Sequence, residues 1–450
     1  MNPEFKRNLW LEISPTRLML MAVVLGVIFA ITWFAAGDAD RPAALAGIAE
    51  GLFGVIVGLW GSFKAGRSVA DEIRERTWDF QRLSALSPMA MTLGKLFGAT
   101  SYVWFGGLIC LGVAMFGHAA GQDWATAAEM AGKLVLLGVF AHAVALAVSL
   151  AVVRRGRGRD RVDAFVFTIA GIVAFQSGSE LSGGGMVGTV RRMSADGDAM
   201  QATQWWGVSL PWETWGYISL GVLVVWAFLT AWRLMRVELQ APANPLWYPL
   251  FLLAPALLLG GLADNTLGRL ISVYAIVHGL VLATLLVEPK DFVAWRALGA
   301  RLRTGAKGAG RYWPSAFSGL IVAFLAACAL AVVAFVAPGV QEKPVSWLVG
   351  FAAFAFLLRE TAIFAFFHLG ANQRRGDFAA LLTIALLCFA GPAVLGIANL
   401  DAANGLFIVQ PEAGLTSHLL SIASGLVQAA MFAVMAQARW RGREKALATA

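Results

Sequence analysis

The charged residues between positions 64 and 95 are the clearest candidates for function, because their spacing predicts an amphipathic helix. The segment lies between two long apolar runs. Its large apolar residues follow one another at intervals of four, seven and three, which places them on one stripe of an α-helix: Val69, Ile73, Phe80 and Leu83. We therefore predict a helix over residues 68–86, ended by Ser87-Pro88, that lies on the membrane surface or against a partner protein.

Catalytic and nucleotide-binding patterns are missing from the sequence. Gly94-Lys95 is followed by leucine and has no glycine five positions earlier, so it does not match the phosphate-binding loop G-x-x-x-x-G-K-[ST]. Neither a G-x-S-x-G nucleophile turn nor an H-E-x-x-H zinc pair occurs. The three cysteines show no CxxC spacing. We therefore predict no enzyme activity, no catalytic residue, no metal site and no cofactor bound by this chain.

Ionisable residues inside the apolar runs are the second kind of candidate. Glu50 lies about a third of the way into the second run, where a carboxylate is costly and is kept mainly for ion or proton transfer. We predict that it lines a transport pathway or bonds to a neighbouring helix. Lone histidines in such runs are predicted to be packing residues that are hydrogen-bonded within the helix bundle, namely His142, His278 and His418.

The composition requires a membrane around these residues. Hydrophobic residues make up 59% of the 450 and charged residues 14%, and the mean hydropathy is +0.70. In hydrocarbon only a helix or a closed barrel satisfies its own backbone hydrogen bonds. We predict an all-α integral membrane protein with about twelve transmembrane helices of roughly 18 to 24 residues. The predicted spans begin near Leu18, Ala43, Leu96, Leu134, Val162, Trp215, Leu246, Leu270, Ser315, Ser346, Phe378 and Ser417.

The distribution of basic residues tests this count. With twelve spans and both termini cytoplasmic, 29 of the 35 lysines and arginines fall on the inner side, as the positive-inside rule requires. The excess of basic charge therefore reflects orientation in the membrane, and nucleic acid is not a predicted partner. Interleaved basic loops and the lack of an organellar targeting segment favour a bacterial inner (cytoplasmic) membrane.

One motif in the charged segment resembles the inner loop of type-2 ATP-binding-cassette (ABC) exporter permeases. The pattern is glutamate, arginine, threonine, then leucines, Ser-Pro and Gly-Lys, at Glu75, Arg76, Thr77, Leu83, Leu86, Ser87, Pro88, Gly94 and Lys95. In that family the loop after the second span forms a coupling helix that fits a groove on a separate ATPase subunit, which binds ATP-Mg. The resemblance implies that role for Glu72, Glu75, Arg76, Thr77, Asp79, Arg82 and Leu83.

The resemblance covers mainly the first half of the chain. Residues 1–240 are predicted to form a six-span permease-like domain with an amphipathic N-terminal arm over residues 5–13. Family members place short re-entrant helices between the fifth and sixth spans, which corresponds here to the outer segment 179–212. Its tryptophans also fit an ordinary aromatic belt at the membrane surface.

Residues 241–450 are predicted to form a second six-span region, which could be a degenerate repeat of the first. Arg359-Glu360-Thr361 echoes the motif of the first half, and the echo suggests a second docking loop with Arg359, Glu360, Arg374 and Arg375. Alternatively, Arg359 and Glu360 simply end a span, with arginine reaching the inner interface. The loop 288–311 is a rival docking surface, and its apolar stripe also suits a helix lying on anionic lipid headgroups.

The sequence therefore predicts the membrane permease subunit of an ABC exporter. Its predicted partners are ABC ATPase subunits, membrane lipid, and a second copy of the chain or another permease. The alternative is an ion-gradient-driven secondary transporter, because twelve spans with both ends inside is a common plan for that class.

Overall fold

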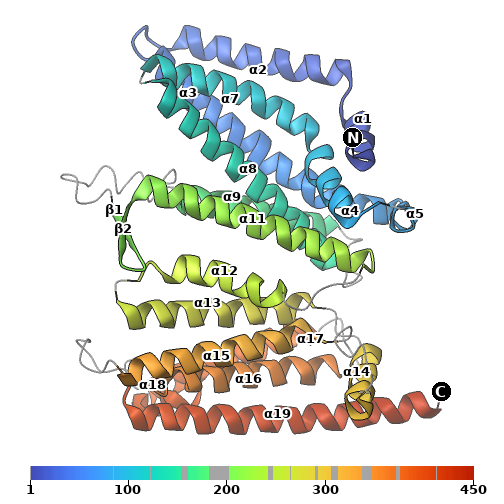
Figure 1. Cartoon of the computed structure of the whole chain (residues 1–450), viewed down its shortest axis with the longest axis vertical. Helices are drawn as coiled ribbons and strands as arrows, with labels where there is room; N and C mark the ends of the chain where they lie inside the picture. Colours follow the sequence, from blue (N-terminus) through green and yellow to red (C-terminus); the bar gives the residue numbers. More distant parts are fainter. Residues whose placement is uncertain are drawn as a thin grey trace. The chain divides into compact units, whose positions relative to one another are not determined.

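The computed structural model of the chain (Figure 1) describes residues 2–84, 86–121, 123–153, 161–181, 202–241, 247–263, 265–288, 292–305, 313–336, 347–370, 376–411 and 413–449. These residues are almost all helical, apart from connecting segments and one two-stranded hairpin. Ten of the described helical segments are long and apolar enough to cross a membrane. The structure thus agrees with the prediction of an all-α, multi-pass membrane protein.

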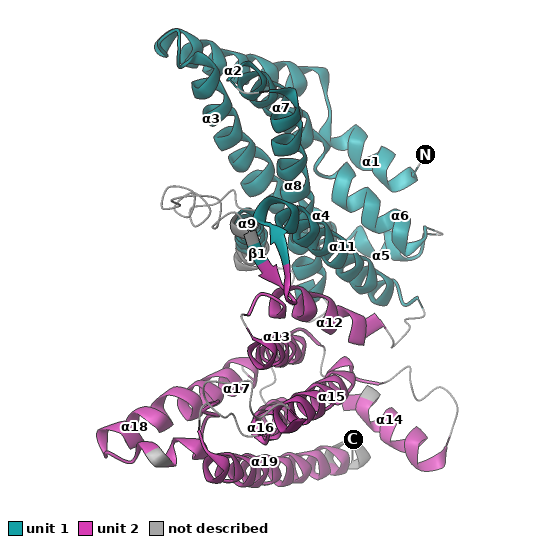
Figure 2. Cartoon of the chain, turned by 60° about the vertical axis from the view of Figure 1, so that its left-hand side comes forward, with its two compact units in different colours: residues 1–203, 209–243 teal, residues 204–208, 244–450 magenta. Residues whose placement is uncertain are grey.

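The chain divides into two compact units (Figure 2). Unit 1 contains residues 1–203 and 209–243, and unit 2 contains residues 204–208 and 244–450. The predicted boundary after residue 240 lies close to this division. Each unit has buried apolar clusters of its own, so the two are described separately.

Unit 1 begins with the short helix α1 (Pro3–Glu12), followed by α2 (Pro15–Ala35). The second predicted span is continuous from Arg41 to Arg74 and consists of α3 (Arg41–Phe53), the π-helical segment η1 (Gly54–Gly61) and α4 (Ser62–Arg74). Then come α5 (Trp78–Arg82), α6 (Pro88–Leu93), the π-helical η2 (Gly94–Gly98), α7 (Ser101–Gly121), α8 (Trp124–Val153), α9 (Arg161–Leu181) and α11 (Trp212–Glu238).

Three helices of unit 1 begin with the same local signal, a polar capping residue followed by proline. The side chain of Asn2 accepts hydrogen bonds from the backbone of Glu4 and Phe5, and proline opens α1. Ser14 caps α2 in the same way, and Ser87 caps α6. Such caps satisfy backbone N–H groups that have no partner inside the helix, and proline suits the first helical position.

The membrane-length helices of unit 1 bury small and apolar residues against one another. Helices α2, α3 and α7 share one buried cluster that includes Leu25, Phe53 and Val103. His142 on α8 is buried, and its Nε2 lies 2.8 Å from the carbonyl oxygen of Val57. A Cβ atom on Gly61 would lie 2.0 Å from the same nitrogen, so only glycine permits this approach. His142 is therefore a packing residue, as predicted.

Unit 2 contains α12 (Trp247–Gly260), α13 (Thr266–Val287), α14 (Phe292–Thr304), α15 (Ser315–Val336) and α16 (Val349–His368). A further apolar segment consists of α17 (Gly376–Ala385), the π-helical η6 (Leu386–Ala390) and α18 (Gly391–Ile397). The 3-10 helix η7 (Asp401–Leu406) precedes the long α19 (Leu415–Thr449), which packs along α16. A buried cluster formed by α12, α13, α15 and α16 includes Leu252, Val277 and Leu357.

Each of the twelve predicted spans coincides with a helix, but two of these helices are not among the ten candidate spans. Helix α12 has 14 residues, which is short for a bilayer. Helix α9 has 21 residues, and several of its side chains lie outside the described part of the structure. Ten spans are therefore supported by length and composition, and the count of twelve stays a prediction.

A hairpin occupies the described end of the outer segment, where short helices were expected. Strand β1 (Ala202–Trp205) pairs with β2 (Val208–Pro211). The two residues between them, Trp206 and Gly207, both have positive φ angles, as in the tight turns that suit two-residue hairpins. At the turn of the hairpin, Trp205 and Trp206 belong to unit 2, as α12 does. Their indole N–H groups donate hydrogen bonds to carbonyl groups of α12. Residues 182–201 lie outside the described part.

Candidate functional site

The predicted single helix over residues 68–86 is wrong, because the structure divides this segment into pieces. Helix α4 ends at Arg74, and Arg76 takes a left-handed conformation with a φ of 60°. The backbone N–H of Thr77 then donates a hydrogen bond to the carbonyl of Glu72. This bond is typical of helix ends that contain one left-handed residue, and that residue, here Arg76, is usually glycine. A new short helix, α5, starts at Trp78. The break separates two groups of apolar residues that the sequence had placed on one stripe.

We name residues 74–84 the tip, because they form the turn beyond the end of α4. Most of the residues for which docking was predicted are exposed there: Glu75, Arg76, Thr77, Asp79 and Leu83. Phe80 and Leu83 are 78% and 86% exposed, although both are large and apolar. Val69 of the predicted stripe is instead fully buried. The tip therefore presents two apolar side chains ringed by charged and polar groups.

Arg82 and Glu72 have partners inside unit 1. Arg82 is half-buried and lies 3.7 Å from Asp79 and 4.0 Å from Glu238 of α11. The side chain of Glu72 forms ion pairs with Lys95 and Arg7. Glu72 is therefore an internal residue, and the docking role implied for it by the resemblance does not fit its burial.

Four charged residues form a cluster beside the tip, and we call it the charge network: Glu4, Arg7, Glu72 and Lys95. Glu4, Glu72 and Lys95 are buried, whereas the side chain of Arg7 is 40% exposed. The Nζ atom of Lys95 lies 2.9 Å from Oε1 of Glu4, and the lysine side chain is fully buried. A nitrogen of Arg7 lies 2.9 Å from the same carboxylate oxygen. The two acids and two bases balance in charge, which offsets part of the cost of removing them from water.

The charge network joins three elements of unit 1. Glu4 and Arg7 come from α1, Glu72 from α4, and Lys95 from η2. Helix α5 is tied to the same place, because Lys95 donates a hydrogen bond of 3.1 Å to Oε1 of Gln81. The indole N–H of Trp78, which is itself buried, bonds to Glu238 of α11 at 3.2 Å. A force applied to the tip would therefore reach several helices at once.

The N-terminal arm is a helix, as predicted, but polar residues make its inward contacts. Glu4 and Asn8 are buried, and Nδ2 of Asn8 donates to Glu4 at 2.8 Å. Glu12 at the end of the arm pairs with Lys64 of α4 at 2.7 Å. Trp10 and Leu11 are exposed, so the arm presents apolar residues on its outside while ion pairs hold it to unit 1.

The carboxyl group of Glu4 should make unit 1 sensitive to acid. Burial alone raises its pKa, but the Lys95 ammonium and the Arg7 guanidinium outweigh this effect and hold the pKa below its ordinary value of 4.5. A carboxyl with a lowered pKa stabilises the folded state above its ordinary pKa, and this stabilisation is lost as the pH falls through the lowered pKa. We expect unit 1 to lose stability below about pH 4.5, and Glu4→Gln to weaken that dependence. Unfolding midpoints measured in detergent between neutral and acid pH test this; equal slopes for wild type and variant would contradict it.

Glu50 has a partner in the neighbouring span. Its Oε1 lies 2.5 Å from Nε2 of His118 on α7. The side chains of Glu50 and His118 are 37% and 25% exposed, so both are partly buried. This contact agrees with the alternative that Glu50 bonds to a neighbouring helix.

In unit 2 the predicted second docking loop is wrong for Arg359 and Glu360. Both residues lie in the middle of α16 and are buried. They therefore also do not end a span, as the alternative held. Glu360 pairs with His278 of α13, and Arg359 bonds to the carbonyl of Phe407 at 2.9 Å. Arg374 and Arg375 lie outside the described residues.

Helix α14, which was predicted to dock a partner or lie on lipid, packs its apolar stripe against its own chain. Phe292 and Leu298 are buried, and Phe292 clusters with Leu369 and Ala436 from α16 and α19. The ring of Trp440 lies 4.4 Å from that of Phe292. This stripe is therefore not available to insert among lipid tails, although Val293 and Leu302 remain exposed.

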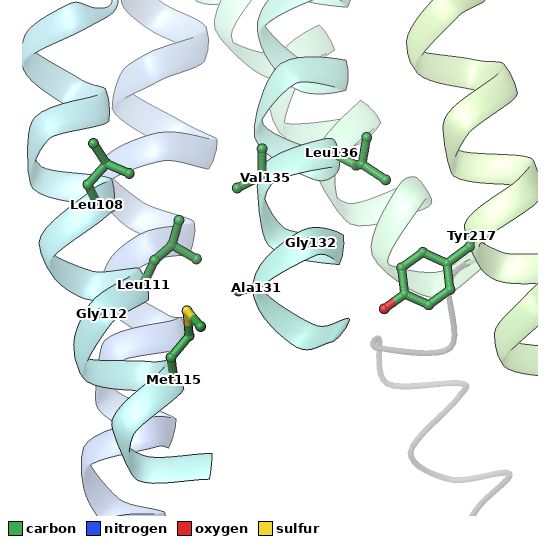
Figure 3. A pocket seen from close by; sticks show the side chains of 9 residues that line it. All are labelled: Leu108, Leu111, Gly112, Met115, Ala131, Gly132, Val135, Leu136 and Tyr217. Atoms are coloured by element: carbon green, nitrogen blue, oxygen red, sulfur yellow. The ribbon is translucent and has the colours of Figure 1, made fainter. Parts of the chain in front are cut away.

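An apolar recess of about 630 Å³ lies between α7 and α8 of unit 1 (Figure 3). Leucine, valine, methionine, alanine and glycine line it, and Tyr217 of α11 closes one side. The hydroxyl of Tyr217 donates to the backbone carbonyl of Glu129 at 2.6 Å. The recess thus accommodates hydrocarbon and offers little to a polar ligand.

Comparisons with protein families, with curated proteins and with solved structures give no match for this chain. Among the described residues, no group of three or more His, Cys, Asp or Glu side chains is placed to hold a metal ion.

Proposed function

We propose that this chain is the membrane permease subunit of an ABC exporter, and that separate ATPase subunits dock on the tip. The observation that carries the proposal is a pair of exposed apolar residues, Phe80 and Leu83, on a short helix that is anchored from behind by buried ion pairs. Exposed large apolar groups ringed by polar ones are typical of protein contact sites. The motif that resembles the type-2 permeases lies in the same segment.

The anchoring supports a mechanical role. The second span continues without a break in its helix from Arg41 to Arg74, so movement at the tip is carried along one rod. The charge network and the Trp78 contact couple that rod to α1, η2 and α11. On this proposal, closure of the ATPase pair on ATP-Mg pushes the tip, and unit 1 moves in response.

Co-purification tests the proposal. The tagged full chain, extracted from native membranes in mild detergent, should bring down a stoichiometric subunit that hydrolyses ATP. Replacing Phe80 and Leu83 by serine should lower the amount of that subunit that co-purifies at least about tenfold, because apolar anchors dominate the energy of most protein interfaces. A matched control replaces Val293 and Leu302, two exposed apolar residues of α14, by serine.

Two outcomes would contradict the proposal. One is a wild-type chain that brings down no nucleotide-hydrolysing subunit. The other is full retention of the subunit by the Phe80 and Leu83 variant. Transport that collapses when the proton gradient is dissipated, and that continues without ATP, would instead favour the secondary transporter. That alternative is favoured by one observation, the charged residues buried in the middle of α16.

A further inference from the structure

Unit 2 holds three ionisable residues together inside its helices, and we call them the buried triad: His278, Arg359 and Glu360. Arg359 and Glu360 are 1% and 5% exposed and lie midway along α16, a candidate membrane span. His278 comes from α13, which packs against α16. Charged residues at such depth are costly and are retained mainly where they have a function.

Glu360 stands between the two bases of the triad. Its Oε2 lies 2.6 Å from Nε2 of His278, and its Oε1 lies 3.3 Å from Nη2 of Arg359. Arg359 also contacts the carbonyl of Phe407 at 2.9 Å, Oε1 of Gln428 at 3.5 Å and Sγ of Cys388 at 3.3 Å. Arg359 and Glu360 alone would already form a pair with no net charge. His278 is therefore not needed to neutralise the charge of Glu360.

Histidine is the side chain whose ordinary pKa, about 6.5, lies in the physiological range. In the neutral state, Nε2–H of His278 donates to the Glu360 carboxylate. A proton taken up at Nδ1 would then convert the triad from zero to one positive charge. The side chain of His278 is 19% exposed, whereas those of Arg359 and Glu360 are almost completely buried. His278 is therefore the least buried member of the triad.

The surroundings leave hydrogen bonds free for a second arrangement. Among the described residues, Nε of Arg359 and the hydroxyl of Tyr274 are buried without a hydrogen-bond partner. The ring of Tyr274 lies edge-on to that of His278, with centroids 6.0 Å apart. Buried donors without partners are costly, so unused ones beside an ion pair indicate a site that changes its bonds or takes up water.

Among the other elements packed against α16, helix α17 carries Asp377, which pairs with His368 at 2.7 Å. Tyr248 of α12 donates its hydroxyl to Thr284. Helix α15 carries Cys328 as its one titratable side chain, and η6 contributes Cys388. Helix α19 contributes the neutral Gln428, ten residues beyond His418. The balance of charge therefore depends on His278, Arg359 and Glu360 themselves.

We propose that the buried triad is a proton-binding site, with the proton taken up at Nδ1 of His278. A positive His278 draws the Glu360 carboxylate more strongly and so weakens the hold of that carboxylate on Arg359. Arg359 is then freer to follow its contacts with Phe407, which follows η7, and with Gln428 of α19. Proton binding in the middle of unit 2 is thereby linked to the segment that joins α18 to α19.

A titration of the purified full chain in lipid nanodiscs tests this proposal. The histidine side chains are labelled with ¹⁵N, and the His278 signal is identified by its loss in His278→Gln. We expect this signal to change from that of the neutral ring to that of the protonated ring as the pH is lowered. Glu360→Gln should lower the proton affinity of His278 at least about tenfold, because the neighbouring negative charge is lost.

The chain provides a matched control, since Glu50 and His118 form the other close histidine–glutamate pair among the described spans. Glu50→Gln should shift the His118 signal and leave the His278 midpoint unchanged. A His278 signal that keeps one protonation state over the whole range, or an unchanged midpoint in Glu360→Gln, would overturn the proposal. If Glu360→Gln does not fold, Glu360→Asp keeps the charge but shortens its reach, and an unchanged midpoint there counts equally against it. No ATPase subunit is needed, so this test is independent of docking at the tip.

Discussion

Replacing Lys95 by methionine is expected to destabilise unit 1 by about 3–5 kcal/mol, the usual cost of removing one partner from a buried ion pair. Lys95 is fully buried and contacts the carboxylates of both Glu4 and Glu72. Without it, Arg7 alone would face two buried negative charges. Methionine fills a similar volume, so lost charge rather than lost packing should dominate the effect.

The reaction of Cys110 with a thiol reagent measures this loss. Cys110 is completely buried in unit 1, so it reacts only when the unit opens, provided that Cys328 and Cys388 are first replaced by serine. Lys64→Met is the control, because its pair with Glu12 is partly exposed and should contribute about 1 kcal/mol or less. Adding Glu72→Gln to Lys95→Met should recover part of the stability. A Lys95 variant no less stable than the Lys64 variant would refute the role of the charge network.

Replacing Arg359 by methionine should have a comparable effect on unit 2. Glu360 would keep only His278 as a partner at a buried position, and we expect a loss of about 3–5 kcal/mol. Denaturation in mixed micelles, followed by tryptophan fluorescence, measures the free energy of unfolding. The exposed Arg296 of α14 supplies a matched control, since its replacement by methionine should change stability by less than about 0.5 kcal/mol. Equal stability of the two variants would contradict the prediction.

The sequence predicts the helices well because apolar length is a direct physical requirement of the bilayer. Every predicted span coincides with a helix, and Ser87-Pro88 begins α6 where a break was expected. In contrast, α12 is too short to be recognised as a span by length, although its residues are as apolar as those of its neighbours. Apolar composition alone therefore locates helices more securely than it counts crossings.

The break at Arg76 could not be read from periodicity. A left-handed residue that ends a helix is usually glycine, and arginine gives no such signal. The consequence is large, because Phe80 and Leu83 point outward while Val69 is buried. The burial of Lys95 was also missed. It lies in the Gly-Lys motif, but its partners are at positions 4 and 72, so only the folded chain brings them together.

Arg359 and Glu360 were misplaced for a related reason. A charged pair between apolar stretches is most simply interpreted as the end of a span. The structure shows apolar helix on both sides of the pair and supplies the missing partner, His278, from a helix about eighty residues earlier. We predicted a packing role for this histidine, and the sequence spacing gave no sign of its hydrogen bond to Glu360.

The order of partners along the chain has a consequence for biosynthesis. Glu4 and Arg7 are made before the first span, but Glu72 is made at the end of the second span and Lys95 shortly before the third. Glu4 and Arg7 of α1 can pair with each other during this time, but they must wait for Glu72 and Lys95 while those spans insert. The charge network can be completed only once Lys95 has been translated, so α1 gains its buried partner long after it has itself been made.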